Sequence, residues 1–170
     1  MHTCKKLHSF YLLLLILFIA TACDNIDCPL NNTVYATYTF QDKVNGQSVE
    51  LKDTLTVQPY GKDTVLINRI YNVKSISIPV SHTGNADTLL FHFSSPEGMA
   101  TDTITFVHTN EPHFESLDCA AAVFHTVTHV QWSKQKISPR PLTAIDSVAL
   151  VKAKINYDPQ EHFSIYIHAK

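Results

Sequence analysis

The chain has 170 residues, of which 45% are hydrophobic and 16% are charged, with four glycines and a formal net charge of −2. These values exclude collagen-like, coiled-coil and disordered chains, which need excess glycine, excess charge or few large apolar residues. The near-neutral charge argues against nucleic acid as a partner. The chain holds 17 threonines and 12 serines. A sequence rich in Thr, Val, Ile, Tyr and Phe but poor in Glu and Lys favours strands over helices.

The first 22 residues have the features of an export signal. Two lysines and no acidic residue precede an uninterrupted apolar stretch at residues 10–20. As a helix, this stretch would span roughly 16 Å, about half of a bilayer core. A cleaved signal is therefore favoured over a membrane-spanning helix.

Small residues lead directly into a cysteine at the end of this leader. The sequence Ala20-Thr21-Ala22-Cys23 resembles the lipobox of bacterial lipoproteins, although leucine is commoner at the position of Ala20. The resemblance implies lipidation of Cys23 and cleavage before it, which makes the membrane a partner through the anchor. An ordinary signal peptide that is cleaved near Ala22 and leaves a free Cys23 is the alternative. We predict a signal peptide at residues 1–22, a lipidated tether at 23–32 and one domain at 33–170.

The cysteine count predicts one disulfide. Cys4 lies in the leader and Cys23 is the predicted lipidation site, which leaves Cys28 and Cys119 as an even pair. Because the chain is predicted to be exported to an oxidising compartment, we expect these two residues to be joined. Two buried free thiols, or a metal site with nearby histidines, are the alternatives.

Alternation of apolar and polar residues, typical of half-buried strands, recurs from residue 34 to the C-terminus. Turn signals such as Asn45-Gly46 separate the alternating segments. Pro79 indicates that the fourth strand is an edge strand or ends at that residue. The nine predicted strands cover residues 34–40, 55–57, 65–67, 76–80, 89–93, 104–108, 124–132, 147–155 and 163–167.

Nine strands without intervening helices predict an all-β fold, an antiparallel sandwich of two sheets in which each strand turns one face to the core. An immunoglobulin-like topology is one arrangement with this strand content, and a barrel is the alternative. Along the seventh strand, alternation predicts that Phe124, Thr126, Thr128, Val130 and Trp132 share a face.

A tripeptide of Asp, a hydroxyl residue and an aliphatic residue occurs five times, more often than the composition predicts. One explanation is structural, because Asp favours turns and a Thr followed by an aliphatic residue favours the start of a strand. The tripeptide also resembles the O-glycosylation sequon that Bacteroidota use on exported proteins. By that resemblance, the candidate acceptors are Thr54, Thr64, Thr88, Thr103 and Ser147.

Three segments of the mature chain resemble the corresponding segments of a known family. They are CDNIDCPLNNTV at residues 23–34, PHFESLDC at residues 112–119, and residues 155–163, which begin with INYD. These segments resemble a family of envelope lipoproteins of Bacteroidota whose domain has no assigned function. The resemblance implies an envelope location, and it brings no catalytic residues.

Histidine and acidic residues are the candidates for a metal site. His125 and His129 are predicted on one strand face but about 13 Å apart, too far to share a metal. Glu111, His113 and Glu115 have i, i+2 spacing, so on an extended chain they share a face and are weak candidates for a divalent cation. A solvated loop beside the disulfide is the alternative, and we predict no cofactor.

The sequence contains no hydrolase, metalloprotease, phosphate-loop or dinucleotide motif. Paired carboxylates of the kind used by glycosidases stay open as an alternative, because acidic residues on distant strands can converge. Five tyrosines are candidates for lining a carbohydrate or protein surface, and packing on neighbouring side chains is the alternative. They are Tyr35, Tyr38, Tyr60, Tyr71 and Tyr157.

The absence of a catalytic motif favours a non-enzymatic, lipid-anchored module of the cell envelope, with an envelope protein or a glycan as its partner. The alternatives are a small envelope enzyme that acts on glycans or peptides, and a metal-binding accessory protein centred on His113. In lipoproteins of Bacteroidota, the signal for surface export is an acidic cluster just after the lipidated cysteine. Asp24 and Asp27 resemble only a weak version of that cluster. We therefore expect the protein to be anchored to the outer membrane, on its periplasmic side.

Overall fold

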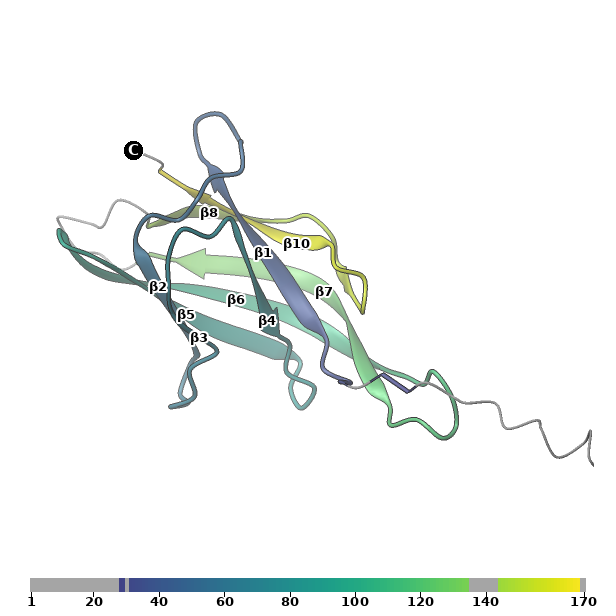
Figure 1. Ribbon diagram of the computed structural model, residues 1–170. Coiled ribbons are helices and arrows are strands. Elements are labelled where there is room, and N and C mark those ends of the chain that lie inside the picture. The colour runs from purple at the N-terminus through teal and green to yellow at the C-terminus, as the bar shows by residue number, and fades with distance from the viewer. Residues whose placement is uncertain (1–27, 30, 135–143, 169–170) are drawn as a thin grey trace, which may run out of the picture.

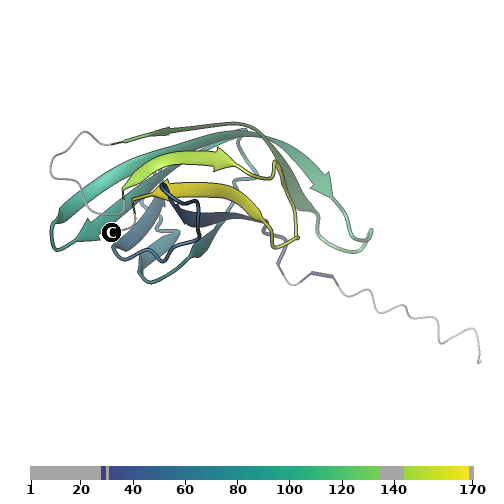
Figure 2. The same cartoon turned by 90° about the horizontal axis from the view of Figure 1, so that it is seen from above.

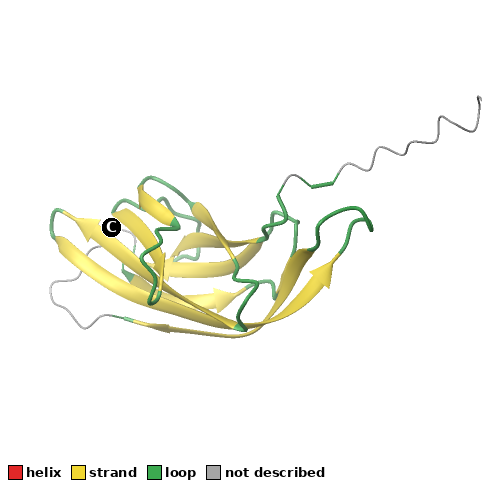
Figure 3. Cartoon of the chain, turned by 90° about the horizontal axis from the view of Figure 1, so that it is seen from below, coloured by secondary structure: helices red, strands yellow, loops and turns green. Residues whose placement is uncertain are grey.

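The computed structural model describes residues 28–29, 31–134 and 144–168. Cys23, the predicted signal peptide and most of the predicted tether lie outside the described residues. Throughout the described ranges the regular structure is strand, and none of it is helix (Figure 3). None of the described residues forms a helix with the length and apolar character that crossing a bilayer requires. The predicted all-β class is confirmed.

The described chain forms ten strands. Their bounds are β1 (Tyr35–Asp42), β2 (Thr54–Pro59), β3 (Ile67–Ile70), β4 (Ser75–Pro79), β5 (Ala86–Ser95), β6 (Gly98–His113), β7 (Ala122–Ser133), β8 (Ile145–Leu150), β9 (Lys154–Ile155) and β10 (Glu161–Ile167). The eighth predicted strand is divided into β8 and β9. The third begins at Ile67, where the predicted one ends, and β6 continues five residues beyond the prediction, to His113.

Two sheets form the sandwich. The smaller has the order β4-β1-β10-β8 and the larger has the order β3-β2-β5-β6-β7-β9. The larger sheet curves over the smaller one (Figures 1 and 2). As predicted from Pro79, β4 is an edge strand, where a residue without an N–H group costs no ladder hydrogen bond.

The prediction of a purely antiparallel fold is wrong for one pair, because β1 and β10 run parallel. They are the first and last strands of the described residues, so all of the chain between them serves as their connection. An immunoglobulin-like topology is also wrong, because that fold pairs its first strand with its second. Here β1 pairs with β4 and β10, whereas β2 belongs to the other sheet.

The prediction that five residues of β7 share one face is wrong for the first half of the strand. His125 and Val127 are buried there, with 1% and 3% of their surfaces exposed. The register between β6 and β7 shifts at Thr128, since Val107 pairs with His129 and His108 with Val127. One extra residue in a strand reverses the direction of the side chains beyond it. Because of this bulge, the inward-facing residues in the two halves of β7 do not follow one continuous alternation.

Aromatic side chains from both sheets meet in the core. Tyr38 on β1 stacks on Phe163 of β10, with ring centroids 4.7 Å apart. Phe91 on β5 packs edge-on against Tyr38 at 6.0 Å, and Phe106 on β6 approaches Phe163 at 5.3 Å. All four rings are at most 1% exposed. This cluster joins the two sheets, and the burial of its rings contributes to the stability of the fold.

Candidate functional site

A cleft of about 370 Å³ lies between the start of β1 and the loop that connects β9 to β10. Its volume is within the range of sites that bind small molecules. Two tyrosines line it together with hydroxyl, amide and carboxylate groups, and we call it the tyrosine cleft. The lining residues are Thr33, Val34, Tyr35, Thr37, Ser77, Asn156, Tyr157, Asp158 and Pro159.

Strand alternation positions the first tyrosine. Ala36 and Tyr38 turn into the core, so Tyr35 and Thr37 point out of the sandwich. The Tyr35 hydroxyl accepts a hydrogen bond from Nδ2 of Asn31 at 3.3 Å, which links the entering chain to the cleft. Because Tyr35 is still 41% exposed, one part of its surface is available to a ligand.

A turn positions the second tyrosine. The backbone N–H of Asp158 donates to Oδ1 of Asn156 at 2.9 Å, and Nδ2 of Asn156 donates to Oδ2 of Asp158 at 3.1 Å. Asn and Asp favour turns because their side chains bond the backbone in this way. The turn presents Tyr157, whose ring packs edge-on against Phe124 with centroids 5.3 Å apart. Tyr157 is therefore held by the turn and by β7.

A buried histidine supports the β1 wall of the cleft. The Thr37 N–H donates to Nδ1 of His162 at 3.1 Å, at the point where the β1–β10 register shifts. Burial, followed by the charge of Lys152, lowers the pKa of His162. The neutral ring can accept this hydrogen bond at Nδ1. The Thr37 and Ser77 hydroxyl oxygens lie 3.3 Å apart, which connects the wall to β4.

The composition of the cleft fits a sugar. An aromatic ring packs against the apolar C–H face of a pyranose, while hydroxyl, amide and carboxylate groups bond its hydroxyls. Among the residues that line the cleft, Asp158 is the single carboxylate. Glycoside hydrolysis ordinarily needs two carboxyl groups that flank the scissile bond. The residue types that line the cleft are therefore chemically suited to holding a sugar.

A pair of buried histidines lies beside the cleft. A pocket of about 190 Å³ shares Thr33 and Val34 with the tyrosine cleft and reaches His125. Oδ1 of Asn110 lies 2.8 Å from Nδ1 of both His108 and His125. The two rings meet edge-to-face with centroids 5.0 Å apart, and both residues are 1% exposed.

The amide of Asn110 determines which nitrogen of each ring donates a hydrogen bond to it. Its Nδ2 donates to the Gly84 carbonyl at 2.8 Å, so its Oδ1 is the acceptor for the two Nδ1–H groups. The Nε2 atom of His108 then faces Oδ2 of Asp87 at 3.7 Å. Burial is the main cause that lowers the pKa of His125 to about 4, followed by the nearby His108 and His82.

Sequence reasoning missed this histidine pair. It placed His125 and His129 on one face, whereas His125 is buried and His129 is exposed, because the bulge at Thr128 lies between them. The available signal was the alternation of His108 with Phe106 on β6, which indicates a histidine that faces the core.

The weak metal candidates do not assemble into a site. Nε2 of His113 lies 3.0 Å from Oε1 of Glu115, so this pair is an ion pair when the histidine is protonated. His113 also stacks on Phe124 with centroids 4.1 Å apart. Within residues 28–29, 31–134 and 144–168, no three His, Cys, Asp or Glu side chains are placed to hold a metal ion. Glu111, exposed on β6, therefore does not complete a ligand set with the other two.

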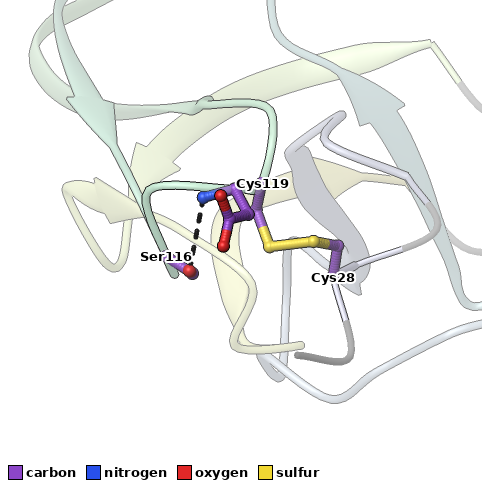
Figure 4. The surroundings of a disulfide bond; sticks show 4 residues. Cys28, Ser116 and Cys119 are labelled. Atoms are coloured by element: carbon purple, nitrogen blue, oxygen red, sulfur yellow. Dashed lines mark hydrogen bonds between the residues drawn. A yellow bond between two sulfur atoms is a disulfide. The ribbon is translucent and has the colours of Figure 1, made fainter. Parts of the chain in front are cut away.

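The structure joins Cys28 to Cys119, the pair that the cysteine count predicts (Figure 4). The sulfur atoms are 2.06 Å apart and the Cα atoms 5.4 Å apart. The Cys119 N–H donates to the Ser116 carbonyl at 3.3 Å, which forms a turn within the loop between β6 and β7. The bond therefore connects this loop to the chain just before β1.

The repeated tripeptides mostly follow the strand alternation. In four of the five the aliphatic residue is buried, and the exception is the exposed tripeptide at Asp63. Two of the aspartates accept backbone hydrogen bonds: Asp87 from Ser81, and Asp102 from Ile145, both at 2.9 Å. The structural explanation of the repeat is thus strengthened, with Asp as an acceptor for a neighbouring segment.

The candidate glycosylation sites differ in accessibility. Thr64 is exposed in the loop before β3. Thr54, Thr88 and Thr103 are partly buried on the outer face of the larger sheet, and Thr103 lies inside β6 rather than at its entrance. Ser147 is partly buried on β8. Modification of these hydroxyls stays a prediction, and Thr64 is the most accessible acceptor.

The five tyrosines fall into three groups. Tyr35 and Tyr157 come together in the tyrosine cleft, although 122 positions separate them (157 − 35 = 122). Tyr38 is buried in the aromatic core. Tyr60 and Tyr71 are exposed, at 70% and 63%, and neither lines the cleft.

Comparison with protein families adds one finding. The model of a family of unknown function, DUF6452, matches residues 54–167, which is more than half of the chain. The chain belongs to this family. The DUF6452 match includes two of the three segments that carry the resemblance described above, while residues 23–34 and β1 precede it. Comparison with curated proteins finds no match, and neither does comparison with solved structures.

Proposed function

We propose that this DUF6452 protein is a lipid-anchored module of the cell envelope that binds a glycan in the tyrosine cleft and catalyses no reaction. The observation that carries the binding role is the cleft itself, in which Tyr35 and Tyr157 meet beside hydroxyl, amide and carboxylate groups. The single carboxylate of its lining supports binding over hydrolysis.

Two observations support the location. The leader ends in the lipobox-like Ala20–Cys23 sequence, and the disulfide between Cys28 and Cys119 is typical of proteins exported from the cytosol. The resemblance to envelope lipoproteins of Bacteroidota supports the same compartment. We place the module on the periplasmic side of the outer membrane, anchored through Cys23.

An oligosaccharide array probed with the full-length protein in detergent tests the binding role. We expect a class of envelope glycan to be retained and to be recovered uncleaved. Tyr35→Ala and Tyr157→Ala should each weaken binding by about fivefold, since an aromatic contact contributes about 1 kcal/mol.

Tyr60→Ala and Tyr71→Ala are matched controls, because these tyrosines are exposed but lie outside the cleft. They should leave the affinity unchanged. Failure to retain any glycan, or an equal loss in all four variants, contradicts the proposal. Release of a shorter glycan would instead favour the alternative of an envelope enzyme.

A further inference from the structure

Two large apolar side chains are exposed at the tip of the loop between β6 and β7, residues 114–121. Leu117 is 99% exposed and Phe114 is 60% exposed, and they lie three positions apart. Isolated exposed apolar residues are common on soluble proteins. The position of this pair relative to the membrane anchor is what distinguishes it.

The disulfide places the loop close to the anchor. Cys119, two residues after Leu117, is bonded to Cys28, which lies five residues after Cys23. Five extended residues reach at most about 17 Å. The loop, residues 31–34 and the start of β1 lie at the same end of the molecule (Figures 1 and 2). Whatever orientation the domain adopts, this end cannot move far from the bilayer.

An aromatic contact closes the base of the loop. His113, at the end of β6, stacks on Phe124 near the start of β7, with ring centroids 4.1 Å apart. Glu115 and Asp118 are exposed beside the tip. Their charges favour a zwitterionic lipid surface over an anionic one.

We propose that residues 114–121 contact the bilayer, with Phe114 and Leu117 inserted at the boundary between headgroups and acyl chains. This inference rests on the lipid anchor proposed above. Two apolar side chains bind a membrane only weakly, so they act as a second signal beside the acyl chains. Contact at this end fixes the orientation of the domain and keeps the opposite end of β1 away from the membrane.

Tryptophan fluorescence in reconstituted vesicles tests this orientation. The full-length protein carrying Leu117→Trp is placed in phosphatidylcholine vesicles that contain lipids brominated on the acyl chain. Val44→Trp is the matched control, because Val44 is 87% exposed but follows the far end of β1. The 8 residues of β1 separate its two ends by roughly 26 Å. The unmutated chain, whose single tryptophan is Trp132, gives the background signal.

We expect blue-shifted emission from position 117 and quenching at least twofold stronger than at position 44. Equal quenching at the two positions, or none at position 117, overturns the inference. Blue-shifted emission without quenching also overturns it, because the loop would then be covered by protein. Radiolabelled palmitate incorporation is measured on the same samples, so that failure of the anchor is distinguished from failure of the loop contact.

Discussion

The amide of Asn110 orients two buried imidazoles through one oxygen atom. Its Oδ1 accepts from both Nδ1–H groups, and the hydrogen bond from its Nδ2 to Gly84 prevents the amide from being reversed. Each ring therefore donates from its Nδ1 atom within the sandwich. A positive charge on the His125 ring would face the His108 imidazole at a centroid distance of 5.0 Å with little solvent to screen it.

Stability should therefore fall at acidic pH. Folding lowers the pKa of His125 to about 4 from an ordinary value of 6.5. The unfolded chain thus binds more protons between these two values, and stability is lost as the pH falls through this window. From pH 7 to pH 4.5 the expected loss is about 2–3 kcal/mol. Urea denaturation at the two pH values measures it.

Histidine variants check the assignment. His125→Gln removes the titrating group, so the difference in stability between the two pH values should shrink. His129→Gln changes an exposed residue four positions away and should keep the difference. If the two variants show the same pH dependence as the unmutated protein, His125 does not cause the effect.

At the scale of the elements, one aspartate connects the two sheets. Asp102 lies on β6 of the larger sheet, and its Oδ2 accepts the Ile145 N–H at the start of β8 in the smaller sheet, at 2.9 Å. The side chain is 0% exposed. The hydrogen bond satisfies a backbone N–H that water does not reach.

Replacing this aspartate should loosen the contact between the sheets. Asp102→Ala leaves the Ile145 N–H without its partner, so we expect a loss of about 2 kcal/mol in the free energy of unfolding. Asp63→Ala alters the exposed member of the same repeated tripeptide and should change stability by less than about 0.5 kcal/mol. Urea midpoints compare the two variants, and equal midpoints would refute the structural role of Asp102.

At the scale of the whole molecule, the disulfide restricts the unfolded chain. It joins positions 91 apart and encloses β1 through β6. On the chain-entropy model, closing a loop of this length stabilises the fold by about 4–5 kcal/mol. The expected result is a loss of this size in Cys28→Ser/Cys119→Ser, measured by urea denaturation. The unmutated protein under reducing conditions should match the double variant, and a loss below about 1 kcal/mol would contradict the expectation.

The sequence predicted the class of fold and most of its strands. Alternation located β1, β2, β4, β5 and β10, and the cysteine count selected the pair that the structure joins. The errors occurred where alternation is interrupted. The bulge at Thr128 reverses the side chains of β7 by one residue, and a local pattern that assumes a constant period of two does not reveal it.

The candidate site was predictable only in its residue types. Tyrosines were identified as candidates for a carbohydrate surface, but the sequence did not distinguish Tyr35 and Tyr157 from the buried Tyr38. The histidine pair depends on the β6–β7 register, which sets His108 and His125 on either side of Asn110.

The sequence by itself determined the strand content, the two-sheet class and the pairing of the cysteines, because each follows from local periodicity or from counting. Only the tertiary structure decided the parallel pairing of β1 with β10, the cleft between Tyr35 and Tyr157, and the loop at Leu117 beside the entering chain. These features join segments that are about ninety or more positions apart. Such contacts form when the two sheets bury their apolar faces together, and that requirement involves the whole chain at once.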